Sequence, residues 1–323
     1  MQVMMPSPIL QRQRTLAGPV QVQGIGLHTG VPVNLSLNPA PANTGIVFRR
    51  IDLEGFSIKA RAAAVARVSY ATSLMRKGVL ISTTEHLLSA LAALGADNVY
   101  ADLDNLEVPI MDGSALPFVR EILKVGLKQQ RACRRCIEII RPIEIQEGSK
   151  RIAVYPSEGF RITCSIDFPH SLIGRQTLEW ISGSGDYAAQ IAPARTFGFI
   201  DEVEKLRAAG LVRGGSLENA VVLSRDGVLN PKGLRFADEF CRHKALDLIG
   251  DLALLGHPVI GHVVAHRAGH AMHYALVSRL LQEKSAWRLI DSSSIHAPVP
   301  LPGPAPTAVA VESSRVTVSA RSM

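Results

Sequence analysis

The sequence is poor in cysteine, in aromatic residues and in long apolar runs. Its 323 residues include four cysteines and 5% aromatic residues, and no uninterrupted apolar run approaches the ~20 residues that cross a bilayer. The N-terminal segment lacks the apolar core of a signal peptide, which argues against export and against a disulfide framework. We therefore expect a cytoplasmic protein without membrane-spanning helices.

Charge is mildly unbalanced. Lys and Arg number 35 against 28 Asp and Glu, which leaves a net charge of +7. This excess suits an anionic substrate or an anionic membrane surface. No basic run is interleaved with aromatic residues, so nucleic acid is not expected as a partner, and no obligate protein partner is evident.

The patterning predicts an α+β fold with two domains of similar topology, each a mainly antiparallel sheet packed with helices. Strand-like alternation over 13–50 precedes a helix over 83–95, and strand-like runs over 137–168 precede a long helix over 236–256. The length also favours two domains. We place them at 1–130 and 131–289. The Pro- and Ala-rich segment 290–323 is expected to be a disordered tail.

The long helix of the second half carries a polar stripe on an otherwise apolar segment. His243, Asp247 and Asp251 are spaced four residues apart in RHKALDLIGD, so they lie on one side of a helix. One interpretation is a solvated stripe with a weak His–Asp pair, which is common on protein surfaces. The other is a buried pair of metal ligands with a supporting carboxylate.

A second candidate pair lies at the start of the first helix. Glu85 and His86 are adjacent, and zinc hydrolases combine imidazole ligands with a neighbouring carboxylate base. The HExxH pattern is absent, so further ligands must come from a distant segment. His86 with His243 and Asp247 would make a set of three ligands, which leaves one position open as catalytic zinc requires.

Two further sets of residues are weaker signals. Cys133 and Cys136 form a CxxC without the second pair that a zinc ribbon needs. His270 follows Gly269 at an expected strand-to-helix turn, where catalytic groups often lie.

Several motifs in a fixed order resemble the UDP-3-O-acyl-N-acetylglucosamine deacetylases, the zinc amidohydrolases of lipid A synthesis. The motifs are GIGLHTG (24–30), PAPANTGIVFRR (39–50), ISTTEHL (81–87), DNVYADLDNLEVPIMDGSA (97–115), ARTFGF (194–199), GLRFADEFCRHKALDLIGDL (233–252) and AGHA (268–271). The resemblance extends from about residue 12 to 288. It implies two similar α+β domains whose helices face each other across an active-site cleft.

The resemblance also implies the reaction and the metal site. The N-acetyl amide of a UDP-linked acylated sugar, UDP-3-O-(3-hydroxyacyl)-N-acetylglucosamine, would be hydrolysed with release of acetate, the committed step of lipid A biosynthesis. Catalytic Zn²⁺ would be bound by His86, His243 and Asp247, and Glu85 would be the general base.

Other roles are implied residue by residue. His270 matches the cationic general acid, and Asp251 matches the carboxylate that orients it. Thr196 matches the hydroxyl donor to the tetrahedral oxyanion, while Phe197 and Lys244 match substrate-contacting positions.

The acyl chain of this substrate requires an apolar passage, which we place in an insertion at residues 200–222. Val203 and Leu217 are candidates to line it, with Arg207 as a further substrate contact; ordinary core packing is the alternative. A long acyl chain is also compatible with peripheral contact with the inner membrane.

The chain departs from the family pattern at two positions. Many members carry a cysteine where Ala71 lies, and many carry an asparagine where His273 lies. Neither change affects the expected ligands or base. The alternatives to this activity are a zinc amidohydrolase for another N-acyl sugar and an inactive UDP-sugar-binding regulator.

Overall fold

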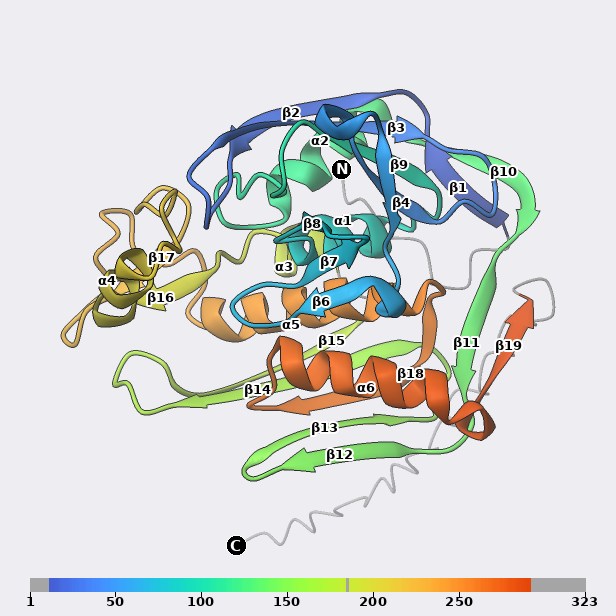
Figure 1. Ribbon diagram of the computed structural model, residues 1–323. Helices are drawn as coiled ribbons and strands as arrows, with labels where there is room; N and C mark the ends of the chain where they lie inside the picture. Colours follow the sequence, from blue (N-terminus) through green and yellow to red (C-terminus); the bar gives the residue numbers. More distant parts are fainter. Residues whose placement is uncertain (1–11, 184–185, 292–323) are drawn as a thin grey trace, which may run out of the picture.

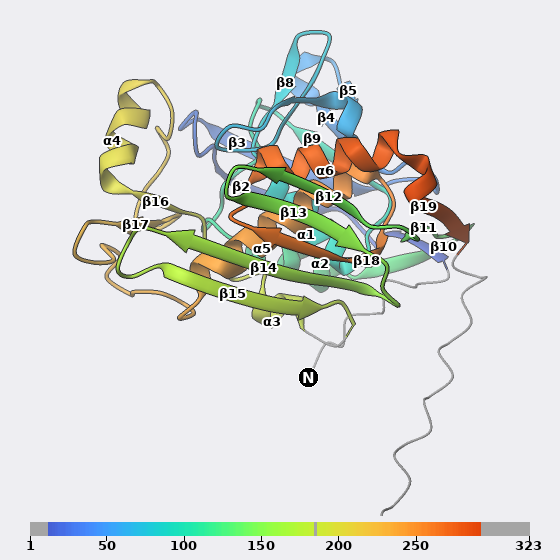
Figure 2. The same ribbon diagram turned by 90° about the horizontal axis from the view of Figure 1, so that it is seen from below.

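Helices lie between two sheets in this protein (Figure 1). The computed structural model describes residues 12–183 and 186–291. One sheet comes from the first half of the chain and the other from the second half, and Figure 2 shows the second sheet from its outer face. None of the helices in these two ranges is long and apolar enough to cross a membrane.

The first sheet has five strands. Their order is β2 (Val20–Ile25), β3 (Pro32–Pro39), β9 (Val99–Leu103), β4 (Ile46–Arg50) and β5 (Phe56–Lys59). The central strand β9 pairs antiparallel with β3 and parallel with β4. The two outer pairs, β2 with β3 and β4 with β5, are antiparallel.

The second sheet repeats this arrangement. The corresponding strands are β12 (Ile143–Glu147), β13 (Lys150–Tyr155), β18 (Val259–His266), β14 (Phe160–Phe168) and β15 (Gly174–Ile181). Strand β18 pairs antiparallel with β13 and parallel with β14, and both outer pairs are antiparallel. The identical strand order and directions confirm the predicted similar topology of the two halves.

The helices occupy equivalent places in both halves. Helix α1 (Glu85–Leu94) precedes β9 and α2 (Leu116–Val125) follows it, whereas α5 (Glu239–Leu252) precedes β18 and α6 (His270–Gln282) follows it. Helices α1 and α5 pack against each other between the sheets. The helices expected over 83–95 and 236–256 are therefore confirmed.

Each half also carries an insertion, which lies between β5 and α1 in the first half and between β15 and α5 in the second. In the first half it is β6 (Val65–Arg67), β7 (Ser73–Arg76) and β8 (Val79–Ile81). In the second half it is α3 (Tyr187–Gln190), β16 (Phe197–Phe199), α4 (Ile200–Ala208) and β17 (Val221–Leu223). The part containing β16, α4 and β17 projects from one side of the molecule (Figure 1).

Additional strands connect and extend the halves. Strand β1 (Arg12–Leu16) pairs antiparallel with β10 (Leu127–Cys133), which leads into β11 (Arg135–Ile139). Strand β11 pairs with β18 and with β19 (Trp287–Asp291). Strand β19 thus continues two residues past the predicted end of the second domain at 289. The remainder of the predicted tail, 292–323, lies outside the described residues.

Helix α1 is buried almost all round because a sheet covers one side and α5 the other. Its residues Leu87, Leu88, Leu91 and Leu94 are at most 2% exposed, which is typical of a helix inside a core. The helix ends where Gly95 adopts a left-handed conformation with a φ of 70°, as expected for a C-terminal cap.

Gly250 allows α5 to approach the start of α1. A methyl group at this position would overlap the backbone carbonyl of Glu85, so only a residue without a side chain fits here. This contact sets the distance between the two helices at the point where Glu85 and His86 begin α1.

We predict that Gly250→Ala destabilises the protein by about 1–3 kcal/mol, since overpacking a fixed backbone contact outweighs the ~1 kcal/mol gained in helix propensity. The melting temperature should fall. Gly227→Ala is the matched control because a methyl group there meets no atom within 4 Å. Equal melting temperatures for the two variants would contradict this account of the helix contact.

Candidate active site between helices α1 and α5

Three potential metal ligands meet at the helix contact. His86 lies in the first turn of α1, and His243 and Asp247 lie one turn apart on α5. The Oδ1 atom of Asp247 is 3.7 Å from Nε2 of His86 and 3.4 Å from Nε2 of His243. All three side chains are buried, and their ligand atoms lie within 4.8 Å of one another.

Both histidines are in the state that binds a metal. Burial lowers the pKa of His86 to about 4 and that of His243 to about 3, so both imidazoles are neutral at neutral pH. Nδ1 of His243 lies 3.1 Å from the carbonyl oxygen of Ala194, to which a neutral ring donates. Its Nε2 lone pair is then directed to the ligand cluster.

Asp247 supplies the decisive test of whether a metal fits. Its Oδ2 accepts a hydrogen bond of 2.9 Å from Nζ of Lys244, whereas its buried Oδ1 has no partner within residues 12–183 and 186–291. Burial opposes ionisation of Asp247, but His243 and Lys244 outweigh it and lower the pKa. An unpartnered buried carboxylate oxygen beside two neutral imidazoles is a donor set that fits a divalent metal.

Glu85 lies beside this cluster. Its Oε2 accepts a hydrogen bond of 3.0 Å from the backbone N–H of Thr72, and its Oε1 is 4.0 Å from Nε2 of His270. Burial raises the pKa of Glu85 to about 7, although His270 opposes this shift. Such a pKa is suited to a general base at neutral pH.

His270 is held in the opposite protonation state. Burial lowers its pKa, but the carboxylate of Asp251, whose Oδ2 lies 2.7 Å from Nδ1, outweighs burial and raises the pKa to about 9. The ring is therefore an imidazolium at neutral pH. Nε2 of this cationic ring lies 4.0 Å from Oε1 of Glu85 and 3.9 Å from Oδ2 of Asp247.

Asp251 is fixed by two further contacts that the sequence did not predict. The Oγ1 of Thr72 donates to its Oδ1 over 2.6 Å, and Nδ1 of His273 lies 2.8 Å from its Oδ2. Thr72 Oγ1 is also 3.2 Å from Nδ1 of His270. Asp251, His270 and His273 satisfy one another by hydrogen bonding, so they do not need a metal although their atoms are close.

A cavity of about 360 Å³ opens at this site. Glu85, His86 and His270 line it together with Thr196 and Lys244. The hydroxyl of Thr196 makes no hydrogen bond within the described part of the chain. The predicted donor is therefore available to a molecule in the cavity.

Phe197 also lines the cavity and forms its apolar wall. Its ring packs edge-on against Phe240 with a centroid distance of 4.9 Å, and Nζ of Lys244 lies 5.5 Å from its centroid. Lys244 therefore lines the cavity and also donates a hydrogen bond to Asp247.

The segments IMDGSA (110–115) and ARTFGF (194–199) join the two halves. The backbone N–H of Thr196 donates to the carbonyl of Gly113 over 2.8 Å. A methyl group at Gly113 would overlap the carbonyl of Asn219. Arg195 forms a buried ion pair of 2.8 Å with Glu239 at the start of α5, so this junction fixes Thr196 against the helix that carries the ligands.

The GIGLHTG motif forms a loop fixed by one buried carboxylate. Glu107 accepts hydrogen bonds of 2.9 Å from the backbone N–H groups of His28 and Thr29 and from the hydroxyl of Thr83. Leu27 of this loop lines the active-site cavity and accepts a bond of 3.0 Å from the N–H of Gly214. The loop therefore links the cavity to the insertion of the second half.

Val203, Arg207 and Leu217 do not line this cavity. Val203 and Arg207 belong to α4, none of whose residues is buried, and Arg207 donates to the carbonyl of Gly215 over 2.8 Å. Leu217 is 42% exposed. Ordinary core packing therefore does not account for Val203 and Leu217, whereas Val222 of the same segment is buried in β17.

Comparison with known proteins agrees with this geometry. The family model described as UDP-3-O-acyl N-acetylglycosamine deacetylase matches residues 13–282. A protein of Solibacter usitatus (strain Ellin6076) named UDP-3-O-acyl-N-acetylglucosamine deacetylase is 55% identical over 89% of this chain and 97% of its own length. A protein of the same name from Myxococcus xanthus (strain DK1622) is 47% identical over 88% of this chain and 91% of its own length. Another, from Acidithiobacillus ferrooxidans (strain ATCC 53993 / BNL-5-31), is 46% identical over 93% of this chain and 99% of its own length. The chain thus belongs to the UDP-3-O-acyl N-acetylglycosamine deacetylase family.

Proposed function

We propose that this protein hydrolyses the N-acetyl amide of UDP-3-O-(3-hydroxyacyl)-N-acetylglucosamine and releases acetate, in the cytoplasm, as the committed step of lipid A biosynthesis. The observation that carries the proposal is that Nε2 of His270 lies 4.0 Å from Oε1 of Glu85 and 3.9 Å from Oδ2 of Asp247, whose Oδ1 has no hydrogen-bond partner among the described residues. Family membership supplies the substrate class.

His86, His243 and Asp247 would hold a single Zn²⁺. Three protein ligands are the number found in catalytic zinc sites, which keep an open position. Bound there, zinc would supply a Lewis acid that polarises the acyl oxygen and lowers the pKa of water.

Glu85 acts as the general base. It takes a proton from the attacking water as the water oxygen bonds to the acetyl carbon. The backbone N–H of Thr72 holds one carboxylate oxygen in place and leaves the other for the proton. A nearby metal cation would lower the pKa of Glu85 from its value of about 7 and keep it ionised.

His270 and Thr196 act on the tetrahedral stage of the reaction. The imidazolium of His270 and the hydroxyl of Thr196 stabilise the oxyanion, since preorganised donors are most effective where charge develops. His270 then donates its proton to the amide nitrogen, the C–N bond breaks, and acetate and the free amine leave. Asp251 keeps His270 protonated for this step.

The substrate groups fit distinct parts of the site. Lys244 and Lys150 line the cavity and suit the diphosphate of a UDP-linked sugar. For the acyl chain we propose a passage along the insertion 200–222, with Val203 and Leu217 as apolar contacts and Arg207 at its edge. We propose domain limits of 1–130 and 131–291, the second extended from 289 to the end of β19.

The function is tested by acetate release from the UDP-linked substrate. Glu85→Gln should retain the parent's zinc content and lower kcat by on the order of 10²–10⁴-fold, the usual contribution of general acid–base catalysis. His86→Ala should instead lower the zinc content together with activity. Parent-like turnover by zinc-loaded Glu85→Gln would exclude Glu85 as the base, and an inactive parent protein with full zinc content would overturn the proposed function.

The pH dependence tests the role of His270. Activity requires the protonated ring, so kcat/KM should fall as pH rises through the pKa of about 9. Asp251→Asn removes the charge that raises this pKa, so the basic limb should move to lower pH, toward the ordinary histidine value of about 6.5. Zinc content should stay at one per chain. An unmoved basic limb in folded Asp251→Asn would assign that limb to another group.

The acyl passage is tested with substrates of different chain length. Val203→Asp should raise KM for the long-chain substrate by about tenfold or more, because a charge enters an apolar contact, and leave an analogue without the acyl chain unaffected. Leu281→Asp is the matched control, since Leu281 is 38% exposed on α6. The same chain-length dependence in both variants would place the passage elsewhere.

A further inference from the structure

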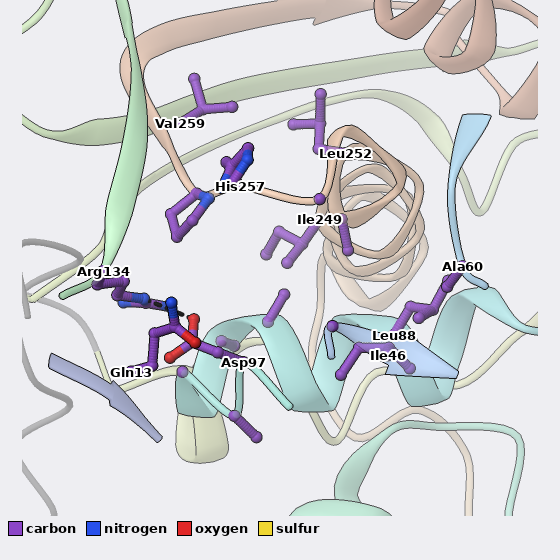
Figure 3. A pocket seen from close by; sticks show the side chains of 18 of the residues that line it. Gln13, Ile46, Ala60, Leu88, Asp97, Arg134, Ile249, Leu252, His257 and Val259 are labelled. Atoms are coloured by element: carbon purple, nitrogen blue, oxygen red, sulfur yellow. Dashed lines mark hydrogen bonds and ion pairs between the residues drawn. The ribbon is translucent and has the colours of Figure 1, made fainter. Parts of the chain in front are cut away.

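A second cavity (Figure 3) has a volume of about 220 Å³ and is lined in part by residues of α1 and α5 other than those of the ligand cluster. Leu88 and Ala92 of α1 and Ile249 and Leu252 of α5 contribute to it. The active-site cavity shares none of these residues. Both halves of the chain therefore form a space that the deacetylation mechanism does not use.

The walls of this cavity are largely apolar. Figure 3 shows Ile46 and Leu88 on one side and Ile249, Leu252 and Val259 on the side formed by the second half. Apolar walls gain free energy when a ligand displaces water from them, by about 25 cal/mol per Å². The cavity thus suits the apolar body of a ligand.

Its charges are strongly one-sided. Four arginines line the cavity against one acidic residue, Asp97. Asp97 is already engaged, because Nε of Arg134 lies 2.7 Å from its Oδ1 and the backbone N–H of Arg14 donates to its Oδ2 over 2.9 Å. No carboxylate therefore remains in the lining to balance the other arginines.

Arg61 is one of these arginines, and no carboxylate of the described residues pairs with it. Its guanidinium lies so close to Gly256 that a methyl group there would overlap it. The guanidinium forms no ion pair or hydrogen bond with the residues that the structure describes. Burial lowers its pKa, and His257 beside it is neutral because burial, with Arg61 and Arg135, lowers the histidine pKa to about 4.

Trp180 supplies an independent sign of a missing partner. The side chain lines the cavity and is only 4% exposed, and its Nε1–H has no acceptor within the two described ranges. Buried indole N–H groups usually find a partner. A cation without a carboxylate and a donor without an acceptor thus border the same apolar space.

We propose that this cavity binds a small amphiphile with a carboxylate head and an apolar body, such as a medium-chain fatty acid. The carboxylate would pair with the planar guanidinium of Arg61 and accept from Trp180. The body would fill the space between α1 and α5. The volume of the cavity is below the roughly 300–1,000 Å³ of drug-sized sites, which favours a short chain. An inorganic anion is not favoured, because it would not displace water from the apolar walls.

Tryptophan fluorescence provides the test, because the chain has only two tryptophans. In a Trp287→Phe background Trp180 is the sole reporter, so decanoate titrated into the full-length protein should change its emission saturably. Arg61→Gln should weaken this binding about tenfold or more, the usual cost of losing a charged hydrogen bond. Ala92→Leu should weaken it by filling the apolar part while keeping Arg61.

Controls separate this site from nonspecific binding. Arg288→Gln removes the same charge from an exposed position outside the cavity and should bind decanoate like the background variant. Decanol and acetate, which carry only the body or only the head, should bind far more weakly. Decanoate bound in the active-site cavity would not depend on Arg61.

The proposal is overturned if decanoate causes no saturable change, if both Arg61→Gln and Ala92→Leu bind like the background variant, or if decanol binds as tightly as decanoate. Melting curves of both variants establish that each is folded. Because the ligand contacts both halves of the chain, decanoate should also raise the melting temperature of the Trp287→Phe protein, and it should not do so for Arg61→Gln.

Discussion

The close packing of α5 against the start of α1 is the contact on which the site depends. Gly250 lies directly on the backbone of Glu85, so no side chain separates the helices there. His86 and Glu85 from the first half thereby meet His243, Asp247 and Asp251 from the second. Neither half alone contains all of these side chains, which gives a physical reason for two similar α+β units joined face to face.

Burial at this contact has opposite effects on different side chains. It keeps His86 and His243 neutral and raises the pKa of Glu85 to about 7. His270 lies in the same buried region, but the carboxylate of Asp251 reverses the effect and holds the ring protonated. One desolvated environment thus holds two neutral imidazoles, a carboxyl group with a raised pKa and an imidazolium, and the imidazolium depends on one hydrogen-bonded carboxylate.

The sequence predicted the parts of this arrangement that are local. The four-residue spacing of His243, Asp247 and Asp251 and the adjacency of Glu85 and His86 depend only on helix geometry. Thr72 could not be foreseen, because its contacts with Glu85 and Asp251 join segments 13 and 179 residues apart.

The alternation of the strands predicted two similar halves, whereas their identical strand order follows from hydrogen bonds between distant segments. The tail limit at 289 falls inside strand β19, whose five residues all pair with β11. That Arg61 has no ion-pair partner among the described residues likewise becomes evident only when both halves surround it.

X-ray absorption at the zinc edge of the zinc-loaded protein tests the central claim most directly. The account predicts nitrogen and oxygen ligands at about 2.0–2.2 Å, two of them imidazoles, and one imidazole fewer in whatever zinc His86→Ala retains. A sulfur ligand at about 2.3 Å, from Cys133, Cys136 or another of the four cysteines, would contradict it. So would a spectrum that His86→Ala leaves unchanged at full zinc content.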